Sequence, residues 1–122
     1  MRFSRDSSST DNLIRAYGAG ELRINDAIYR GTVIVSASVV LSEPAIADVS
    51  DLKDLDPARI LALGPEIFLL GTGQRQSFPT ASFRAQFLGA GIGLEVMDTG
   101  AACRTFNVLV TEQRRVVALL MV

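Results

Sequence analysis

The stretch LLGTGQR, at residues 69–75, begins as a continuous apolar run and ends in a glycine loop that carries an arginine. Together with the preceding EIF, it shows no alternation of apolar and polar residues. This pattern is typical of a strand that is covered on both faces of a sheet. The stretch therefore predicts a central strand of an α/β fold, whose carboxyl end is where such folds usually bind their ligands.

Helix signals lie on both sides of this strand. The sequence DLDPARILALGP, residues 54–65, has Asp56 as an N-cap, a proline at the first helical position and a Gly-Pro stop. The sequence TASFRAQFLGAG, residues 80–91, places Phe83 and Phe87 at helical spacing and ends in glycines. Each of the two segments therefore predicts a helix, and the phenylalanine pair is expected in the core.

The carboxyl-terminal part of the chain continues the alternation. IGLEVMD, residues 92–98, and RRVVALLMV, residues 114–122, each predict a strand. Between them, residues 99–110 carry apolar side chains at i, i+4, i+7 and i+8, which form one face of a helix. Asp98 or Thr99 is the expected cap of this helix.

The amino-terminal part predicts strands only. Residues 17–31 predict a β-hairpin, because short alternating runs flank the polar pair Asn25-Asp26. Residues 32–41, TVIVSASVVL, predict one longer strand. We therefore expect a single three-layer α/β domain over residues 15–122, with helices on both faces of the sheet and an N-terminal hairpin. Residues 1–14 are expected to form a disordered polar arm.

The composition indicates a folded domain that does not bind nucleic acid. Its 48% hydrophobic and 20% charged residues are typical of a globular protein, and 122 residues suffice for one core. The mean hydropathy of +0.30 is high, so the apolar excess must enter a covered sheet or a patch that meets a partner. A net charge of −1 provides no basic field for nucleic acid. No apolar run approaches the roughly 20 residues that a membrane-spanning helix needs.

The residue inventory limits the chemistry. The chain has no histidine, so Cys-His and Ser-His-Asp catalytic groups are impossible. Cys103 is the sole cysteine, which excludes an internal disulfide and a cysteine-rich metal site and fits the reducing cytoplasm. The acidic residues do not gather in a calcium-loop pattern. We therefore expect no catalytic residue, no metal and no cofactor.

Several residues are expected to converge on one rim of the sheet. If the strands at 66–71 and 92–98 are adjacent and parallel, their carboxyl ends bring together Gly71, Thr72, Gly73, Arg75, Asp98 and Thr99. The loop amides, the start of the next helix and the arginine could then receive an anion. A tight turn explains the same glycines, and Gln76 stands where a dinucleotide fingerprint has its third glycine. The turn is the favoured interpretation, and the anion site stays open as the alternative.

Other polar residues near this rim have structural interpretations. Cys103 lies at the border of the apolar stripe, so a packed thiol is favoured over a nucleophile. Asp98 is favoured as an N-cap over a general base, and Glu95 as a solvated strand residue. Arg104 and Asn107 lie off the apolar stripe and are either ordinary helix surface or contacts to a partner.

Four segments together resemble a known family: YGAGELRIND, LLGTGQR, GIGLEVMDTGAACRTFNVL and RRVVALLMV. From about Tyr17 to its end, the chain is similar to a family of small proteins that includes mitochondrial complex I assembly factor 3. The most specific matches are Gly71-Thr72-Gly73 with Arg75, Glu95, Asp98-Thr99, Ala102 and Thr105-Phe106-Asn107. The resemblance implies a three-layer fold with a mixed sheet, in which at least one strand runs antiparallel to the others.

The resemblance also implies a function through protein partners. The mitochondrial member binds other assembly proteins and early complex I subunits, so the motif residues carry over as surface determinants and not as catalytic ones. We expect a non-enzymatic interaction domain in the cytoplasm that contacts respiratory subunits or assembly factors at the inner membrane. Its contact rim would comprise residues 71–73, Arg75, Asp98-Thr99, Arg104 and Asn107. The alternative is a binding protein or enzyme that uses this rim for a small anionic ligand.

Overall fold

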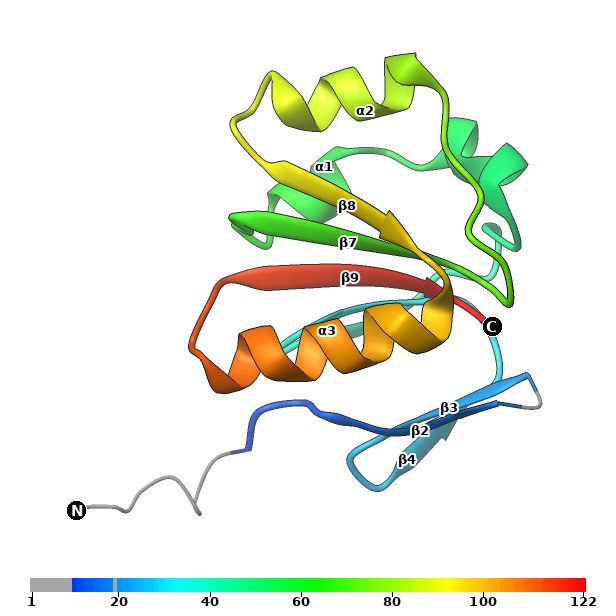
Figure 1. The fold of residues 1–122 in the computed structure, drawn as a ribbon, viewed down its shortest axis with the longest axis vertical. Coiled ribbons are helices and arrows are strands. Elements are labelled where there is room, and N and C mark those ends of the chain that lie inside the picture. Colours follow the sequence, from blue (N-terminus) through cyan, green and yellow to red (C-terminus); the bar gives the residue numbers. More distant parts are fainter. Residues whose placement is uncertain (1–9, 19) are drawn as a thin grey trace.

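A computed structural model describes residues 10–18 and 20–122 (Figure 1). The central sheet has five strands in the order β6-β5-β9-β7-β8. They are β5 (Val33–Ser36), β6 (Val40–Ser42), β7 (Ile67–Thr72), β8 (Gly93–Met97) and β9 (Val116–Met121). A smaller antiparallel sheet consists of β2 (Ile14–Gly18), β3 (Glu21–Ile24) and β4 (Ala27–Tyr29). The helices are the 3-10 helix η2 (Val49–Asp54), α1 (Ala58–Leu61), α2 (Ala81–Leu88) and α3 (Thr99–Thr111).

The central sheet is mixed. Strand β7 pairs in parallel with β8 on one side and with β9 on the other, whereas β5 runs antiparallel to both β6 and β9. Every residue of β9 is buried, and so are the four inner residues of β7. The continuous apolar runs of these strands therefore mark positions covered on both faces, as the sequence predicted.

Helices cover both faces of the sheet, so the domain has three layers (Figure 1). On one face η2, α1 and α2 enclose a core in which the Phe68, Phe83 and Phe87 rings pack with centroids 4.8–6.4 Å apart. On the other face α3 and the small sheet enclose a second core around Phe106, Leu69 and Leu120. The predicted α/β architecture is confirmed, and the phenylalanine pair lies in the core.

Two segments differ from their predicted elements. Residues 32–41 form no single strand, because the chain reverses between β5 and β6. Ser36 closes that turn: its Oγ accepts from Val39 N–H at 3.1 Å, and its own N–H donates to the Val39 carbonyl at 2.9 Å. Apolar β-branched residues on both sides hid this turn. The helix predicted over residues 54–65 is confined to α1, and its N-cap is Pro57 rather than the predicted Asp56. Asp56 Oδ1 nevertheless accepts from Ala58 N–H at 3.0 Å, one residue before that cap.

The small sheet contains the predicted hairpin and one further strand. Strands β3 and β4 pair across Asn25, which adopts a positive φ of 50°, a conformation that two-residue hairpin turns favour. Strand β2 was not predicted. The polar arm expected at residues 1–14 lies mostly outside the described residues. Its last part joins the fold, since Asn12 Nδ2 donates to the Ser36 carbonyl at 2.9 Å and Ile14 is buried at the start of β2.

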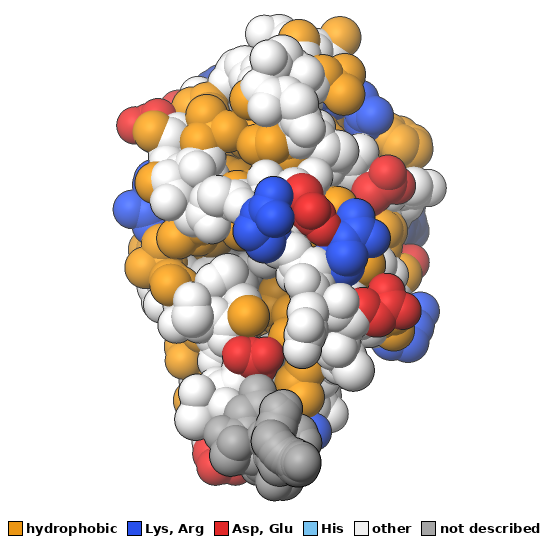
Figure 2. All heavy atoms as spheres, turned by 90° about the vertical axis from the view of Figure 1, so that its left-hand side faces the viewer, with side chains coloured by type: hydrophobic (Ala, Val, Ile, Leu, Met, Phe, Trp, Pro, Cys, Tyr) orange, Lys and Arg blue, Asp and Glu red, His pale blue; other side chains and the backbone are white. Residues whose placement is uncertain are grey.

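Ion pairs hold the end of the central sheet where the parallel strands β7 and β9 begin. Glu66, just before β7, contacts Arg114 and Arg115, just before β9, with Arg115 Nη2 3.7 Å from Glu66 Oε2. The hydrogen bond from Arg114 holds the pKa of the Glu66 carboxyl below its usual range. Figure 2 views this end, and basic and acidic side chains alternate across its middle. The arginines at the amino ends of the parallel strands are thus neutralised locally.

We expect Gly71→Ala to destabilise the fold. A Cβ at this position would lie 3.0 Å from Leu120 Cδ2 and 3.1 Å from both Ala102 Cβ and Thr99 Cα. Such overpacking typically costs about 1–3 kcal/mol. Urea unfolding of the purified variant would measure this loss.

Gly100→Ala is the matched control. The nearest atom to its added methyl is Asp98 Oδ1 at 3.4 Å, which is ordinary contact, and alanine is favoured over glycine in a helix by about 0.5–1 kcal/mol. Equal stability of Gly71→Ala and wild type would contradict the tight contact between α3 and β7.

Candidate functional site

The two glycine-bearing strand exits share one edge of the sheet. In the parallel pairing of β7 with β8, Gly71 lies beside Met97, so both strands end at the same level. The chain segments that follow are bonded to each other: Thr99 N–H donates to the Gly73 carbonyl at 2.8 Å, and Gly73 N–H donates to Thr99 Oγ1 at 2.8 Å. The predicted convergence of these segments is therefore confirmed.

Gly71 and Thr99 lie inside this edge rather than on its surface. Thr99 has no exposed surface, and its hydroxyl donates to the Met121 carbonyl at 2.5 Å while it accepts from Gly73. One buried hydroxyl thus connects the end of β9, the exit of β7 and the first turn of α3. Gly71 is buried as well, and it leaves room for α3. Both residues shape the rim without being available to a partner.

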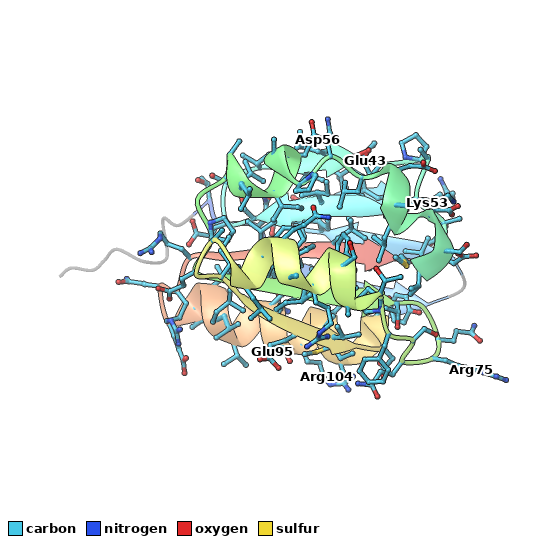
Figure 3. The ribbon with its side chains drawn as sticks, turned by 90° about the horizontal axis from the view of Figure 1, so that it is seen from above. Glu43, Lys53, Asp56, Arg75, Glu95 and Arg104 are labelled. Carbon is cyan, nitrogen blue, oxygen red and sulfur yellow. The ribbon has the colours of Figure 1, made fainter. Side chains whose placement is uncertain are left out.

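Thr72 organises the loop of residues 73–78, which we call the 73–78 loop. Its Oγ1 donates to the Arg75 carbonyl at 2.6 Å and accepts from Ser77 N–H at 2.9 Å. Gln76 Nε2 donates to the Val96 carbonyl at 2.9 Å and so fixes the loop against β8. Arg75 is left exposed and points away from the molecule (Figure 3). The loop is a constrained turn that displays its arginine.

These bonds favour the turn over an anion cradle in the 73–78 loop. The amides of Gly73 and Ser77 already donate to threonine oxygens. The first turn of α3 is also occupied, since Asp98 Oδ1 accepts from Ala101 N–H at 2.9 Å. A carboxylate therefore lies where an anionic ligand would bind, and Asp98 is the N-cap, as its position predicted.

Asn107 joins α3 to the small sheet. Ile14 N–H donates to Asn107 Oδ1 at 2.8 Å, and Asn107 Nδ2 donates to the Ile14 carbonyl at 2.8 Å. The amide therefore satisfies both backbone groups of the first residue of β2, as a neighbouring strand would. Asn107 is neither ordinary helix surface nor an exposed partner contact.

A hollow of about 210 Å³ lies between β2 and α3, beside this amide. We call it the β2–α3 hollow; its lining includes Arg15, Tyr17, Gly100, Cys103, Arg104 and Asn107. Arg15 is the extra residue of a β-bulge, because Ile14 and Ala16 pair with consecutive residues of β3. Arg104 is exposed on the outer side of α3 (Figure 3). Of these residues, only Arg104 and Asn107 were predicted as site residues, since β2 was not recognised.

The groups at the base of the hollow are held uncharged. Burial raises the pKa of the Cys103 thiol to about 12; Arg104 opposes this rise, and Asp98 adds to it by less than Arg104 subtracts. Burial also raises the pKa of Tyr17, and Cys103 and Asp98 add to the effect. A thiol with this pKa is a poor nucleophile at neutral pH, so the packed interpretation of Cys103 is supported.

A second hollow lies between η2 and α2, next to the 73–78 loop. It has a volume of about 690 Å³ and is lined by apolar residues that include Leu52, Leu55 and Phe83. Phe78, the last residue of the 73–78 loop, also lines it and is 64% exposed. No pattern in the sequence pointed to this aromatic residue, because a single phenylalanine in a loop has no periodicity to interpret.

Comparison with known proteins places the chain among small proteins of undetermined biochemistry. The family model described as "Protein of unknown function (DUF498/DUF598)" matches residues 14–121. The "13 kDa major membrane protein" of Francisella tularensis is 34% identical over 117 residues, which is 95% of each chain. A crystal structure described as an outer membrane protein from Bartonella henselae has a TM-score of 0.77 at 32% identity and covers 93% of this chain and 96% of that one.

A vertebrate relative has a described role. The "NADH dehydrogenase (ubiquinone) 1 alpha subcomplex assembly factor 3" of Danio rerio is 30% identical over 115 residues, which are 93% of this chain and 66% of the fish protein.

Among residues 10–18 and 20–122, none of the helices has the length and apolar character that crossing a bilayer demands.

We expect Asn107→Ala to loosen β2 from α3. The change leaves the N–H and the carbonyl of Ile14 without their partner in a partly buried place, and a loss of this kind costs about 1–3 kcal/mol. Hydrogen exchange should accelerate at Ile14 before it does so in the central sheet. Gln86→Ala, an exposed amide on α2, is the control and should change stability by less than about 0.5 kcal/mol. Unchanged exchange at Ile14 would contradict the role of Asn107.

We also expect stability to fall at alkaline pH, partly through Cys103. The folded thiol has a pKa of about 12, and the unfolded thiol titrates near the ordinary value of about 8.5. The stabilisation is complete below the unfolded pKa and is lost as the pH rises towards the folded one, because the unfolded state releases its proton first. Tyr17 acts in the same direction.

Urea midpoints of wild type and Cys103→Ala, measured at neutral pH and near pH 10, check this expectation. The decline should be smaller in the variant. The same decline in both proteins would show that the thiol is already ionised or solvated in the folded state.

Proposed function

Because the chain belongs to the family of proteins of unknown function DUF498/DUF598, we propose that it acts as a protein-interaction domain with an assembly-factor-like role. The vertebrate relative that is named an assembly factor supports this role. The proposed contact surface is the 73–78 loop together with the hollow between η2 and α2. On this proposal the partners are subunits or assembly factors of a respiratory complex, and no enzymatic step is involved.

This proposal rests on one observation: the side chains of Phe78 and Arg75 are both exposed on the 73–78 loop. Phe78 is 64% exposed, and Arg75 forms no ion pair or hydrogen bond through its side chain with any residue in the described part of the chain. Aromatic residues and arginine are the types that contribute most to protein–protein affinity. Both are presented by a loop that the Thr72 hydroxyl already holds in shape. A preformed loop loses little conformational entropy on binding.

The adjoining hollow provides a place for an apolar side chain of the partner. Its buried residues Leu52, Leu55 and Phe83 are reached from the surface beside Phe78. Lys53 is the cationic residue at its border, and it lies at the same end of the molecule as Arg75 (Figure 3). A partner segment with apolar and acidic side chains is complementary to this surface.

We further propose that the protein works in the cytoplasm and associates peripherally with the inner membrane through its partners. Two relatives described as membrane proteins support an association with membranes. The proposal assigns the contact to protein partners, since the proposed surface combines an apolar hollow with a constrained loop.

Affinity purification from cells that produce the protein naturally tests the proposed surface. We expect tagged wild type to retain a defined set of proteins, identified by mass spectrometry, and Phe78→Ser and Arg75→Ala to lose them. Removing a residue that dominates an interface costs about 2 kcal/mol or more, which lowers affinity about thirtyfold. Circular dichroism should show that both variants remain folded, because neither side chain is part of a core.

Leu88→Ser is the matched control. Leu88 is 61% exposed, nearly as much as Phe78, but it lies at the other end of α2. Thr72→Val tests whether the shape of the 73–78 loop matters in addition to its side chains. It keeps Phe78 and Arg75 and removes the hydroxyl that holds the loop in shape. We expect Leu88→Ser to retain the partners and Thr72→Val to weaken their capture. Full retention by Phe78→Ser and Arg75→Ala would remove this surface from consideration.

A further inference from the structure

The β2–α3 hollow places two guanidinium-bearing residues on opposite walls. Arg15 comes from β2 and Arg104 from α3. The Arg104 guanidinium lies over the first turn of its own helix, since Nη1 is 3.6 Å and Tyr17 Cδ2 is 3.7 Å from where a Cβ of Gly100 would be. The absence of a side chain at Gly100 therefore keeps the space between Arg104 and Tyr17 open.

The charges of both arginines are unpaired in the part of the chain that the structure describes. Within residues 10–18 and 20–122, neither side chain forms an ion pair or a hydrogen bond. Other arginines in the described part of the chain are paired with carboxylates: Arg30 with Glu21, Arg59 with Glu43, and Arg114 with Glu66. The walls of the hollow therefore retain donors for an external anion.

The β-bulge is what brings Arg15 to this wall. In a regular strand, the residue after buried Ile14 would point away from α3. The extra residue interrupts the alternation, so that Ile14, Arg15, Ala16 and Tyr17 all border the hollow. Bulges commonly redirect a side chain at a binding site. The two Asn107 hydrogen bonds to Ile14 fix the strand directly beside the bulge.

The base of the hollow is compatible with an anion. Tyr17 and Cys103 are protonated at neutral pH, because the ordinary pKa of each group already lies above 7 and burial raises it further. A protonated phenol donates a hydrogen bond and a protonated thiol carries no repelling charge. The Asp98 carboxylate lies beside the hollow, with Oδ1 3.4 Å from where a Cβ of Gly100 would be, and this oxygen accepts from Ala101 N–H. An incoming anion would therefore lie on the arginine side of Tyr17.

The size of the hollow limits the ligand to a small group. Its volume of about 210 Å³ is below the roughly 300–1,000 Å³ of pockets that enclose drug-sized ligands. Arginine binds carboxylate and phosphate through paired N–H donors, and two arginines match a group with two negative charges. A terminal phosphate group has this size and charge.

We propose that the β2–α3 hollow binds a terminal phosphate group, with Arg15 and Arg104 as its charged partners and Tyr17 as a neutral donor. The group belongs either to a soluble phosphate ester or to the headgroup of a lipid. This site is separate from the 73–78 loop, and the proposal does not depend on the proposed protein-interaction function.

The test titrates inorganic phosphate into the isotope-labelled full chain and follows amide chemical shifts. We expect the shifts to concentrate at residues 14–17 and 100–107 and the melting temperature to rise with phosphate concentration. Arg104→Gln and Arg15→Gln should each weaken binding about tenfold or more, since each removes charge-assisted hydrogen bonds. Gly100→Val should abolish binding because its side chain fills the space, and it should remain folded.

Arg75→Gln is the matched control, because it removes the same charge from another exposed arginine that has no partner among the described residues. It should bind phosphate like wild type. Equal weakening by Arg75→Gln and Arg104→Gln, or shifts spread over all arginines, would overturn the proposal by showing unspecific attraction. Full binding by Gly100→Val would also overturn it.

Vesicles separate the two sources of the phosphate group. Sedimentation with phosphatidylcholine vesicles that contain phosphatidic acid, lost in Arg104→Gln but not in Arg75→Gln, supports a lipid headgroup. Phosphate binding without sedimentation supports a soluble ester. Neither binding nor sedimentation by wild type would overturn the proposal.

Discussion

The close approach of α3 to β7 is the constraint on which the rest of the structure depends. At Gly71 the helix lies so near the strand that a methyl group would meet atoms of Thr99, Ala102 and Leu120. Within this contact, the Thr99 hydroxyl bonds both to Gly73 and to Met121. The chain that leaves β7 is therefore held along the first turn of α3, and the direction of the 73–78 loop follows from that contact.

Local signals explain how much of this arrangement could be predicted from the sequence. The apolar run before Gly71, the cap at Asp98 and the spacing of Phe83 and Phe87 each act within a few residues, so each element was recognisable. The alternation of these elements then required parallel strands and a common edge for their exits. The two exits do meet, through the hydrogen bonds between Gly73 and Thr99, but the burial of Gly71 and Thr99 could not be read from their identity.

The remaining features depend on contacts between residues far apart in the sequence. Strand β2 forms beside a polar segment because Asn107, on α3, satisfies the backbone of Ile14. The turn after β5 is closed by a serine within an apolar β-branched run. Neither contact leaves a pattern in the local sequence. Without β2 there was no reason to consider Arg15, Tyr17 and Gly100 together, and Asn107 was interpreted as surface although it holds two elements in place.

The distribution of charge shows why net charge alone was a weak guide to function. A total of −1 suggests a neutral surface, yet the arginines near the amino ends of β7 and β9 are paired with Glu66. Arg15, Arg75 and Arg104 have no such partner in the described part of the chain. An unpaired guanidinium retains its donors, and a constrained backbone holds each of these residues in a fixed place. These guanidinium groups therefore lie on both sides of the amino-terminal end of α3, and the contact at Gly71 and Thr99 positions the elements that carry the two proposed surfaces.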